Sequence, residues 1–187
     1  MIPNIISNPK RASRVERLMN ELKAQGISEY KMWPSIEISN KPRRTGISRA
    51  HKQIVEWALI EQLPEVCIWE DDIKFHSPEG WEYYLENRPS VPFDLYLGGV
   101  YRGEIEPDGK IERFTGMHCY IISERFYTTF LGVNEELDID GAMSGLGDFY
   151  CCNPFACVQW DGWSDNCQGM MDYSHLLKGR KIFGLNA

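Results

Sequence analysis

The chain has 187 residues, a net charge of −7 and a sequence pI of about 5.2. Apolar residues make up 43% and charged residues 25%, which are globular values, and the length fits one domain over residues 1–187. The acidic balance argues against nonspecific nucleic-acid binding, so no nucleic-acid partner is predicted. It is compatible with an anionic small molecule, because a bound divalent cation reverses the local charge.

The stretch MIPNIISNPKR lacks the basic start and long apolar region of a signal peptide. No stretch approaches the ~18 apolar residues of a membrane helix. We therefore predict a soluble, cytoplasmic protein, and leave peripheral association with a membrane open.

Two strand–helix pairs are predicted in the first third of the chain. They are a strand over 2–7, a helix opened by Pro9 and stopped by Gly26, a strand over 30–36 and a helix over 48–62. Val15, Leu18 and Leu22 recur at helical spacing in the first helix. The polar, basic stretch 37–45 is a predicted loop.

The rest of the chain continues the alternation of strands with helices. Strands are predicted over 66–69, 94–99 and 118–123, helices over 78–87 and 124–131, and 149–159 is β-like but broken by Pro154. The run 66–69, VCIW, is apolar throughout, as in a strand covered on both faces. This order predicts an α/β sheet with helices on both faces.

Three acids, Glu70, Asp71 and Asp72, follow the apolar run directly. In open α/β sheets ligands bind beyond the carboxyl ends of strands, where Gly98 and Gly99 also lie and would let a ligand approach the backbone. Carboxylates at 70 and 72 suit Mg²⁺ or Mn²⁺, which often combine one or two carboxylates with substrate phosphates. Asp71 would bond a ribose hydroxyl. The alternative is a solvated acidic turn that caps the helix near Pro78.

Six cysteines are present. Cys151, Cys152, Cys157 and Cys167 lie close together in sequence, and with His175 they offer a zinc site, although the spacing fits no standard pattern. We predict reduced, mostly buried thiols instead.

Further motifs accompany the acidic triplet in a fixed order along the chain. They are Ile5-Ile6 with Arg14, Gly46 to His51, Trp69 to Ile73, Asp94 to Gly99, Gly116 to Ser123, and Pro154 with Gln159 and Ser164-Asp165. The ordered set resembles glycosyltransferase family 25, the group that contains lipooligosaccharide and collagen galactosyltransferases. The resemblance covers nearly the whole chain.

The resemblance implies a GT-A-like fold with a mixed, mostly parallel sheet. It also implies a nucleotide-sugar donor, usually UDP-linked, with Mn²⁺ or Mg²⁺ as cofactor and inversion at the anomeric carbon. The expected activity is transfer of a hexose, such as galactose, from a UDP-sugar to a saccharide acceptor in surface-glycan or lipooligosaccharide synthesis.

The chain also departs from the family pattern. Ser7-Asn8 stands where the family has Asn-Leu, and Ile47 and Ala50 replace a cysteine and a serine of its Gly-Cys…Ser-His segment. These departures favour one alternative, a non-catalytic GT-A-like nucleotide-binding or scaffold protein. A second alternative is a nucleotide-sugar hydrolase.

Each step of sugar transfer has candidate residues. The metal ligands are Asp72 first and Glu70 second, and the donor-binding residues are Glu70, Asp71, His51, Arg14, Gly98 and Gly99. The base that deprotonates the acceptor is Asp140, then Asp138, with Asp165 as a third candidate. Alternatively, Asp140 is only the N-cap of a short helix.

Other residues have both a functional and a structural interpretation. His118 would reach the metal or the diphosphate, or be a satisfied buried histidine. The basic residues Arg43, Arg44, Lys178, Arg180 and Lys181 would neutralise the diphosphate or be surface charge. The aromatics Trp160, Trp163 and Tyr173 would form a sugar or uracil platform, or belong to the core.

Overall fold

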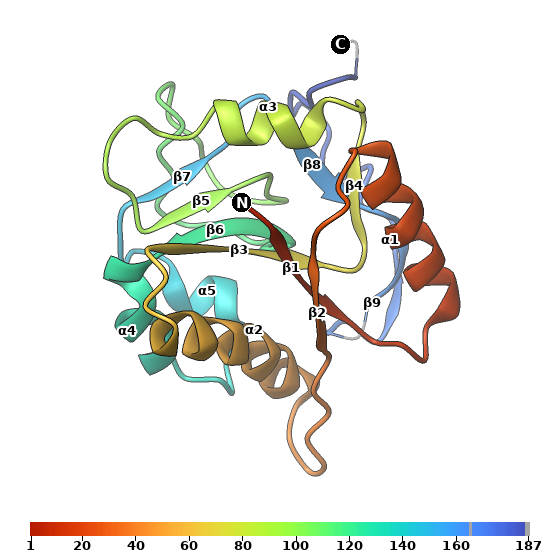
Figure 1. The fold of residues 1–187 in the computed structure, drawn as a ribbon, viewed down its shortest axis with the longest axis vertical. Coiled ribbons are helices and arrows are strands. Elements are labelled where there is room, and N and C mark those ends of the chain that lie inside the picture. Colours follow the sequence, from red (N-terminus) through yellow and green to blue (C-terminus); the bar gives the residue numbers. More distant parts are fainter. Residues whose placement is uncertain (165, 186–187) are drawn as a thin grey trace.

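A six-stranded mixed sheet forms the centre of the computed structural model, which describes residues 1–164 and 166–185 (Figure 1). In spatial order its strands are β2 (Lys31–Pro34), β1 (Pro3–Ser7), β3 (Glu65–Glu70), β6 (Cys119–Ser123), β5 (Leu95–Leu97) and β7 (Phe149–Cys151). β1 is parallel to β2 and β3, and β5 is parallel to β7, whereas β6 is antiparallel to β3 and β5. The sheet is therefore mixed and mostly parallel.

Helices cover both faces of this sheet (Figure 1). α2 (Arg43–Ile60), α4 (Glu124–Gly132) and α5 (Ile139–Met143) pack on one face, and α1 (Ala12–Ala24) and α3 (Gly80–Glu86) on the other. None of the helices in the described part of the chain is long and apolar enough to cross a membrane.

The strand β3 shows why its sequence is apolar throughout. Val66 and Ile68 belong to the core under α2, and Cys67 and Trp69 to the core under α1. Successive strand residues point to opposite faces, so a strand covered on both faces needs a continuous apolar run. The expected fold class, a GT-A-like α/β fold with a mixed, mostly parallel sheet and helices on both faces, is confirmed.

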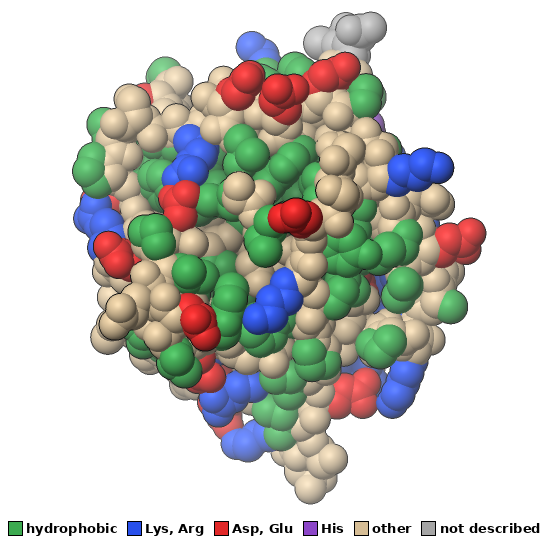
Figure 2. Space-filling view, in the orientation of Figure 1, with side chains coloured by type: hydrophobic (Ala, Val, Ile, Leu, Met, Phe, Trp, Pro, Cys, Tyr) green, Lys and Arg blue, Asp and Glu red, His purple; other side chains and the backbone are tan. Residues whose placement is uncertain are grey.

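The helix α3 is amphipathic. Figure 2 shows acidic side chains gathered over it, and the exposed acids there are Glu79, Glu82 and Glu86. On the inner side, the ring of Tyr84 is fully buried and stacks on Tyr96 of β5, with 4.7 Å between ring centroids. The acidic surface of α3 therefore belongs to the solvent-facing side of a packing helix.

Four short strands lie outside the central sheet. β4 (Ile73–Phe75) pairs antiparallel with β8 (Cys157–Gln159), and β9 (Gly162–Ser164) pairs antiparallel with β10 (Gly169–Met171). The β4–β8 pairing sets Gln159 opposite Ile73, directly after the acidic triplet. The last third of the chain thereby returns to the end of β3.

The helix α2 begins at Arg43, five residues before the predicted start at Ser48. Its first turn is polar because it faces a cleft instead of the core, and Arg43, Arg44 and Gly46 line that cleft. A Cβ on Gly46 would lie 2.0 Å from the carbonyl oxygen of Ile36. Only glycine therefore fits where this turn passes the end of β2.

Candidate functional site

A cleft of about 670 Å³ opens at the carboxyl ends of β1 and β3. Its walls come from the β1–α1 and β2–α2 connections, the acidic triplet, α5 and the β9–β10 pair. The predicted site residues that line it are Arg14, Arg43, Arg44, His51, Glu70, Asp71, Asp72, Asp138, Asp140 and Tyr173. The fold therefore brings most of the candidates to one place.

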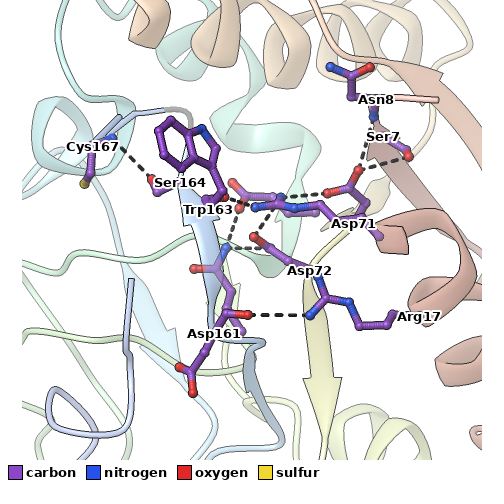
Figure 3. Close-up of polar contacts among 12 residues, drawn as sticks. Ser7, Asn8, Arg17, Asp71, Asp72, Asp161, Trp163, Ser164 and Cys167 are labelled. Carbon is purple, nitrogen blue, oxygen red and sulfur yellow. Dashed lines mark hydrogen bonds and ion pairs between the residues drawn. The ribbon is translucent and has the colours of Figure 1, made fainter. Parts of the chain in front are cut away.

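Asp71 ties the β1–α1 connection to the end of β3. Its Oδ2 accepts hydrogen bonds from the Ser7 hydroxyl at 3.0 Å and the Asn8 backbone N–H at 3.1 Å, as Figure 3 shows. Its Oδ1 accepts a bond from Arg14 Nη1 at 3.0 Å. Both carboxylate oxygens therefore bind protein donors, and this places Asp71 as a support of the cleft wall.

Glu70 and Asp72 share one donor. The Nε2 atom of Gln159 donates to Glu70 Oε2 and to Asp72 Oδ1, each at 2.7 Å. The hydroxyl of Tyr101 donates to Gln159 Oε1, which fixes the orientation of the amide. The two carboxylates are therefore held on either side of one nitrogen atom.

Arg14 supplies the positive charge that faces the triplet. Its Nη1 lies 3.0 Å from Asp71 Oδ1 and 3.0 Å from Asp72 Oδ2. Its Nη2 donates to the backbone carbonyl of Trp163 in β9. The expected donor-binding arginine is therefore already bound to two carboxylates and a neighbouring strand.

Negative charge outweighs positive charge around Asp72. Burial, followed by the charge of Glu70, raises the pKa of Asp72 to about 7 against the pull of Arg14. Burial disfavours ionisation of Glu70, but the hydrogen bond with His51 and the positive charge around Glu70, including that of Arg14, lower its pKa overall. A cation placed between Glu70 and Asp72 would relieve this excess.

His51 holds Glu70 in place. Its Nδ1 lies 2.9 Å from the Tyr120 hydroxyl and its Nε2 lies 3.3 Å from Glu70 Oε1. The side chain is only 1% exposed. With both ring nitrogens paired, His51 acts on the site through Glu70.

His118 lies buried beside the carboxylates. Its Nε2 is 3.4 Å from the Cys157 carbonyl oxygen, while its Nδ1 has no hydrogen-bond partner among the described residues. The pKa of His118 is lowered overall, because burial has a larger effect than the opposing negative charges of Glu70 and Asp72. Burial therefore favours the neutral ring, which differs from the satisfied histidine of the structural alternative by one nitrogen that is unpaired among the described residues.

Asp140 and Asp138 both line the cleft beside α5. Asp140 accepts hydrogen bonds from the Gly116 N–H at 2.8 Å and the Gly141 N–H at 2.9 Å, and burial raises its pKa. Asp140 lies in the first turn of α5, so the N-cap interpretation is wrong, and Asp138 occupies the cap position. Asp138 Oδ1 accepts a bond from Asn166 Nδ2 at 3.0 Å. The third candidate base, Asp165, lies outside the described residues.

Gly98 and Gly99 do not admit a ligand, contrary to the sequence prediction. A Cβ on Gly98 would lie 2.7 Å from Cys157 Sγ, and one on Gly99 would lie 2.3 Å from the Cys157 carbonyl oxygen. Both glycines are buried, and neither lines the cleft. They are small because β8 packs against them.

The aromatic candidates separate into different environments. Tyr173 lines the cleft, and its ring stacks on Tyr101 with 4.5 Å between centroids. Trp160 lies outside the cleft under the ammonium group of Lys74, which is 4.2 Å from the ring centroid. Trp163 is 44% exposed and does not line the cleft either. Tyr173 is therefore the member of this set positioned to meet a ligand.

The C-terminal basic residues do not line the cleft. Arg180 donates to the Gly103 carbonyl oxygen at 2.6 Å and lies over the ring of Phe155. Lys178 and Lys181 are exposed. The diphosphate role expected for this tail is therefore left to Arg43 and Arg44.

Among residues 1–164 and 166–185, no three His, Cys, Asp or Glu side chains are close enough together to hold a metal ion. This speaks against the zinc alternative, and five of the six cysteines are buried free thiols, as predicted. Glu70 and Asp72 still fit Mg²⁺ or Mn²⁺, which take one or two carboxylates together with substrate phosphates and water. The shared Gln159 nitrogen shows that both carboxylates reach a common point.

Three contributors to the site carried no assigned role in the sequence analysis: Gln159, Tyr101 and Tyr120. Gln159 and Tyr120 stand in motifs of the ordered set, but their hydrogen bonds cross 89 and 69 residues of sequence. Tyr101 lies two residues after Gly99, and its nearness to that motif is the sequence feature that could have indicated a role in the site.

No protein-family model and no curated protein matches this chain. Solved structures with a similar fold include HddC from Yersinia pseudotuberculosis complexed with GMP-PN, with a TM-score of 0.52, 15% identity, and coverage of 81% of this chain and 90% of that one. A second structure of HddC from Yersinia pseudotuberculosis gives a TM-score of 0.52 at 14% identity, over 81% of this chain and 90% of that one. A197 from STIV gives a TM-score of 0.53 at 12% identity, over 91% and 93%. At these identities the likeness shows a shared fold.

Proposed function

We propose that this protein is an inverting, metal-dependent glycosyltransferase that moves a hexose from a UDP-sugar to a saccharide acceptor. The observation that carries the proposal is the Glu70–Gln159–Asp72 arrangement, in which two carboxylates converge in a cleft at the carboxyl ends of parallel strands. The choice of a UDP-linked hexose as donor rests on the motifs that resemble glycosyltransferase family 25, and galactose is the first choice of hexose. HddC, which shares the fold, is described as complexed with GMP-PN, and this supports a nucleotide-based donor.

The donor end of the cleft is assigned to the acidic triplet. Glu70 and Asp72 would hold Mn²⁺ or Mg²⁺, which when bound supplies Lewis-acid stabilisation of the leaving diphosphate. His51 and Gln159 keep these carboxylates in position. Arg43 and Arg44, at the start of α2, bring positive charge to the same cleft for the diphosphate.

The acceptor end is assigned to Asp140. Its raised pKa makes this carboxylate a stronger base than an exposed aspartate, which suits it to take a proton from an acceptor hydroxyl. Two backbone amides fix its orientation. Asp138 is the second choice, because it is bound to Asn166.

Calorimetric titration of UDP in the presence of MnCl₂ tests the donor site. We expect binding by the wild type and at least a tenfold loss in Asp72→Asn, since that change removes one carboxylate from the proposed metal site. Asp108→Asn, in the exposed turn 106–110, is the matched control and keeps full affinity. Absence of binding by the wild type, or equal binding by Asp72→Asn, would contradict the proposal.

Turnover separates a transferase from the two alternatives. We expect sugar transfer to a saccharide acceptor that is lost in Asp140→Asn, while UDP binding with MnCl₂ is kept. Sugar release at the same rate with water as the only acceptor would indicate a hydrolase. Binding without turnover of any nucleotide sugar would indicate a scaffold protein.

A further inference from the structure

The β9–β10 pair forms one side of the cleft. Trp163 lies opposite Met170, and these side chains are 44% and 74% exposed on the solvent side. Ser164 and Met171, the neighbours along each strand, line the cleft. Successive residues of a strand alternate between its faces, so one face of this pair borders the cleft.

A two-stranded pair is marginally stable by itself, so its position depends on what anchors it. β9 is anchored to α1 by two arginines. Arg17 Nη1 donates to the carbonyl oxygen of Asp161, directly before β9, at 3.5 Å (Figure 3). Arg14 Nη2 donates to the carbonyl oxygen of Trp163 within β9. Of these two anchors, the one at Arg14 also ends on the acidic triplet, through Asp71 and Asp72.

The guanidinium group of Arg14 joins the two contacts rigidly. It is planar, so its Nη1 and Nη2 atoms cannot move independently. A change in the partners of Asp72 therefore acts on the same group that holds the Trp163 carbonyl, with Asp71 as its remaining carboxylate partner. A cation on Asp72 would compete for its Oδ2 and repel the guanidinium by like charge.

We propose that Arg14 is a positioning residue. It couples the position of β9–β10 to what the Asp72 carboxylate binds. The coupling makes the arrangement of one cleft wall depend on what the acidic triplet binds. We place this wall at the acceptor end of the cleft, where Asn166, between β9 and β10, binds Asp138, and that placement rests on the proposed function. The coupling itself exists without any ligand and is testable in its absence.

Hydrogen exchange at the amides of 162–164 and 169–171 measures the coupling. Asp72→Asn removes a charged partner of Arg14 without touching β9 through its side chain, and we expect exchange there to rise about fivefold. Arg14→Gln is expected to raise it about tenfold. In the double variant Asp72→Asn adds nothing, because the connecting group is gone.

Two control variants accompany this experiment. Asp108→Asn, in the exposed turn 106–110, removes a carboxylate away from the triplet and leaves exchange in β9–β10 unchanged. Arg17→Gln raises exchange, but there the effect of Asp72→Asn persists. If Arg14→Gln does not fold, the contrast between Asp72→Asn and Asp108→Asn decides. Additive effects of Asp72→Asn and Arg14→Gln, or equal exchange in Asp72→Asn and wild type, would overturn the proposal.

The same readout with UDP and MnCl₂ separates the coupling from the proposed function. We expect these ligands to change exchange in β9–β10 of the wild type by about threefold or more, and not in Arg14→Gln. If calorimetry shows binding but exchange in wild-type β9–β10 does not change, the coupling is refuted and the donor site stands. If nothing binds while the ligand-free cycle is non-additive, the proposed function fails and the coupling stands.

Discussion

At the scale of single residues, Asp72 is a carboxyl group whose ionisation the folded protein opposes. Its pKa is raised from 3.8 to about 7, mainly by burial and by the charge of Glu70. The cost of ionising it is therefore absent below pH 3.8, grows as the pH rises, and is complete above about pH 7. Ionised Asp72 destabilises the ligand-free protein, which is what we expect of a carboxylate in the proposed metal site.

Replacement of Asp72 by asparagine removes this cost. As the pH rises from 5 to 8.5, we expect the unfolding free energy of Asp72→Asn, measured relative to that of the wild type, to increase by about 2 kcal/mol. Urea denaturation at several pH values measures the difference. A difference that stays constant with pH would show that Asp72 ionises without penalty in the folded protein.

Gln159 donates a hydrogen bond to each of the two carboxylates, Glu70 and Asp72. Gln159→Leu deprives Glu70 and Asp72 of a donor and leaves the Tyr101 hydroxyl without its acceptor, so we expect a loss of about 2 kcal/mol in unfolding free energy. Tyr101→Phe alone costs about 1 kcal/mol. In the double variant Tyr101→Phe adds little, because its partner is already gone. Full additivity in chemical denaturation would argue that the two residues do not interact.

At the scale of elements, the first turn of α2 is positioned by a close backbone contact. Gly46→Ala places a Cβ 2.0 Å from the Ile36 carbonyl, and backbone cannot yield as a flexible side chain can. We expect a loss of about 3 kcal/mol in unfolding free energy. The matched control is Gly132→Ala at the end of α4, where a Cβ meets nothing within 4 Å. Equal stability of the two variants, in thermal or urea unfolding, would contradict this view of the turn.

The elements also show how far sequence patterns reach. β3, α1 and α4 follow from apolar patterning, because each buries a face or stripe in the core. β4, β8, β9 and β10 are three residues each, too short for a period to show. The start of α2 was missed because its residues face the cleft and carry no apolar pattern.

At the scale of the whole molecule, the site is an assembly of distant segments. The position of the acids at a strand end predicted where the cleft would lie, since strand ends meet at one edge of the sheet. The partners of those acids did not follow from the sequence, because Gln159 reaches Glu70 only through the return of β8 to β4. For the same reason the sequence could not show that β8 packs against Gly98 and Gly99. The two glycines suggested space for a ligand, but Cys157 of β8 occupies it.

In the proposed function, Glu70 and Asp72 together bind a divalent cation with a nucleotide. The most direct measurement is anomalous diffraction from crystals grown with MnCl₂ and UDP. We expect a manganese peak within coordination distance of the Glu70 and Asp72 carboxylates and in contact with the diphosphate of UDP. We expect no such peak in Asp72→Asn. A peak elsewhere in the molecule, or bound UDP with no metal at these carboxylates, would contradict the proposed function.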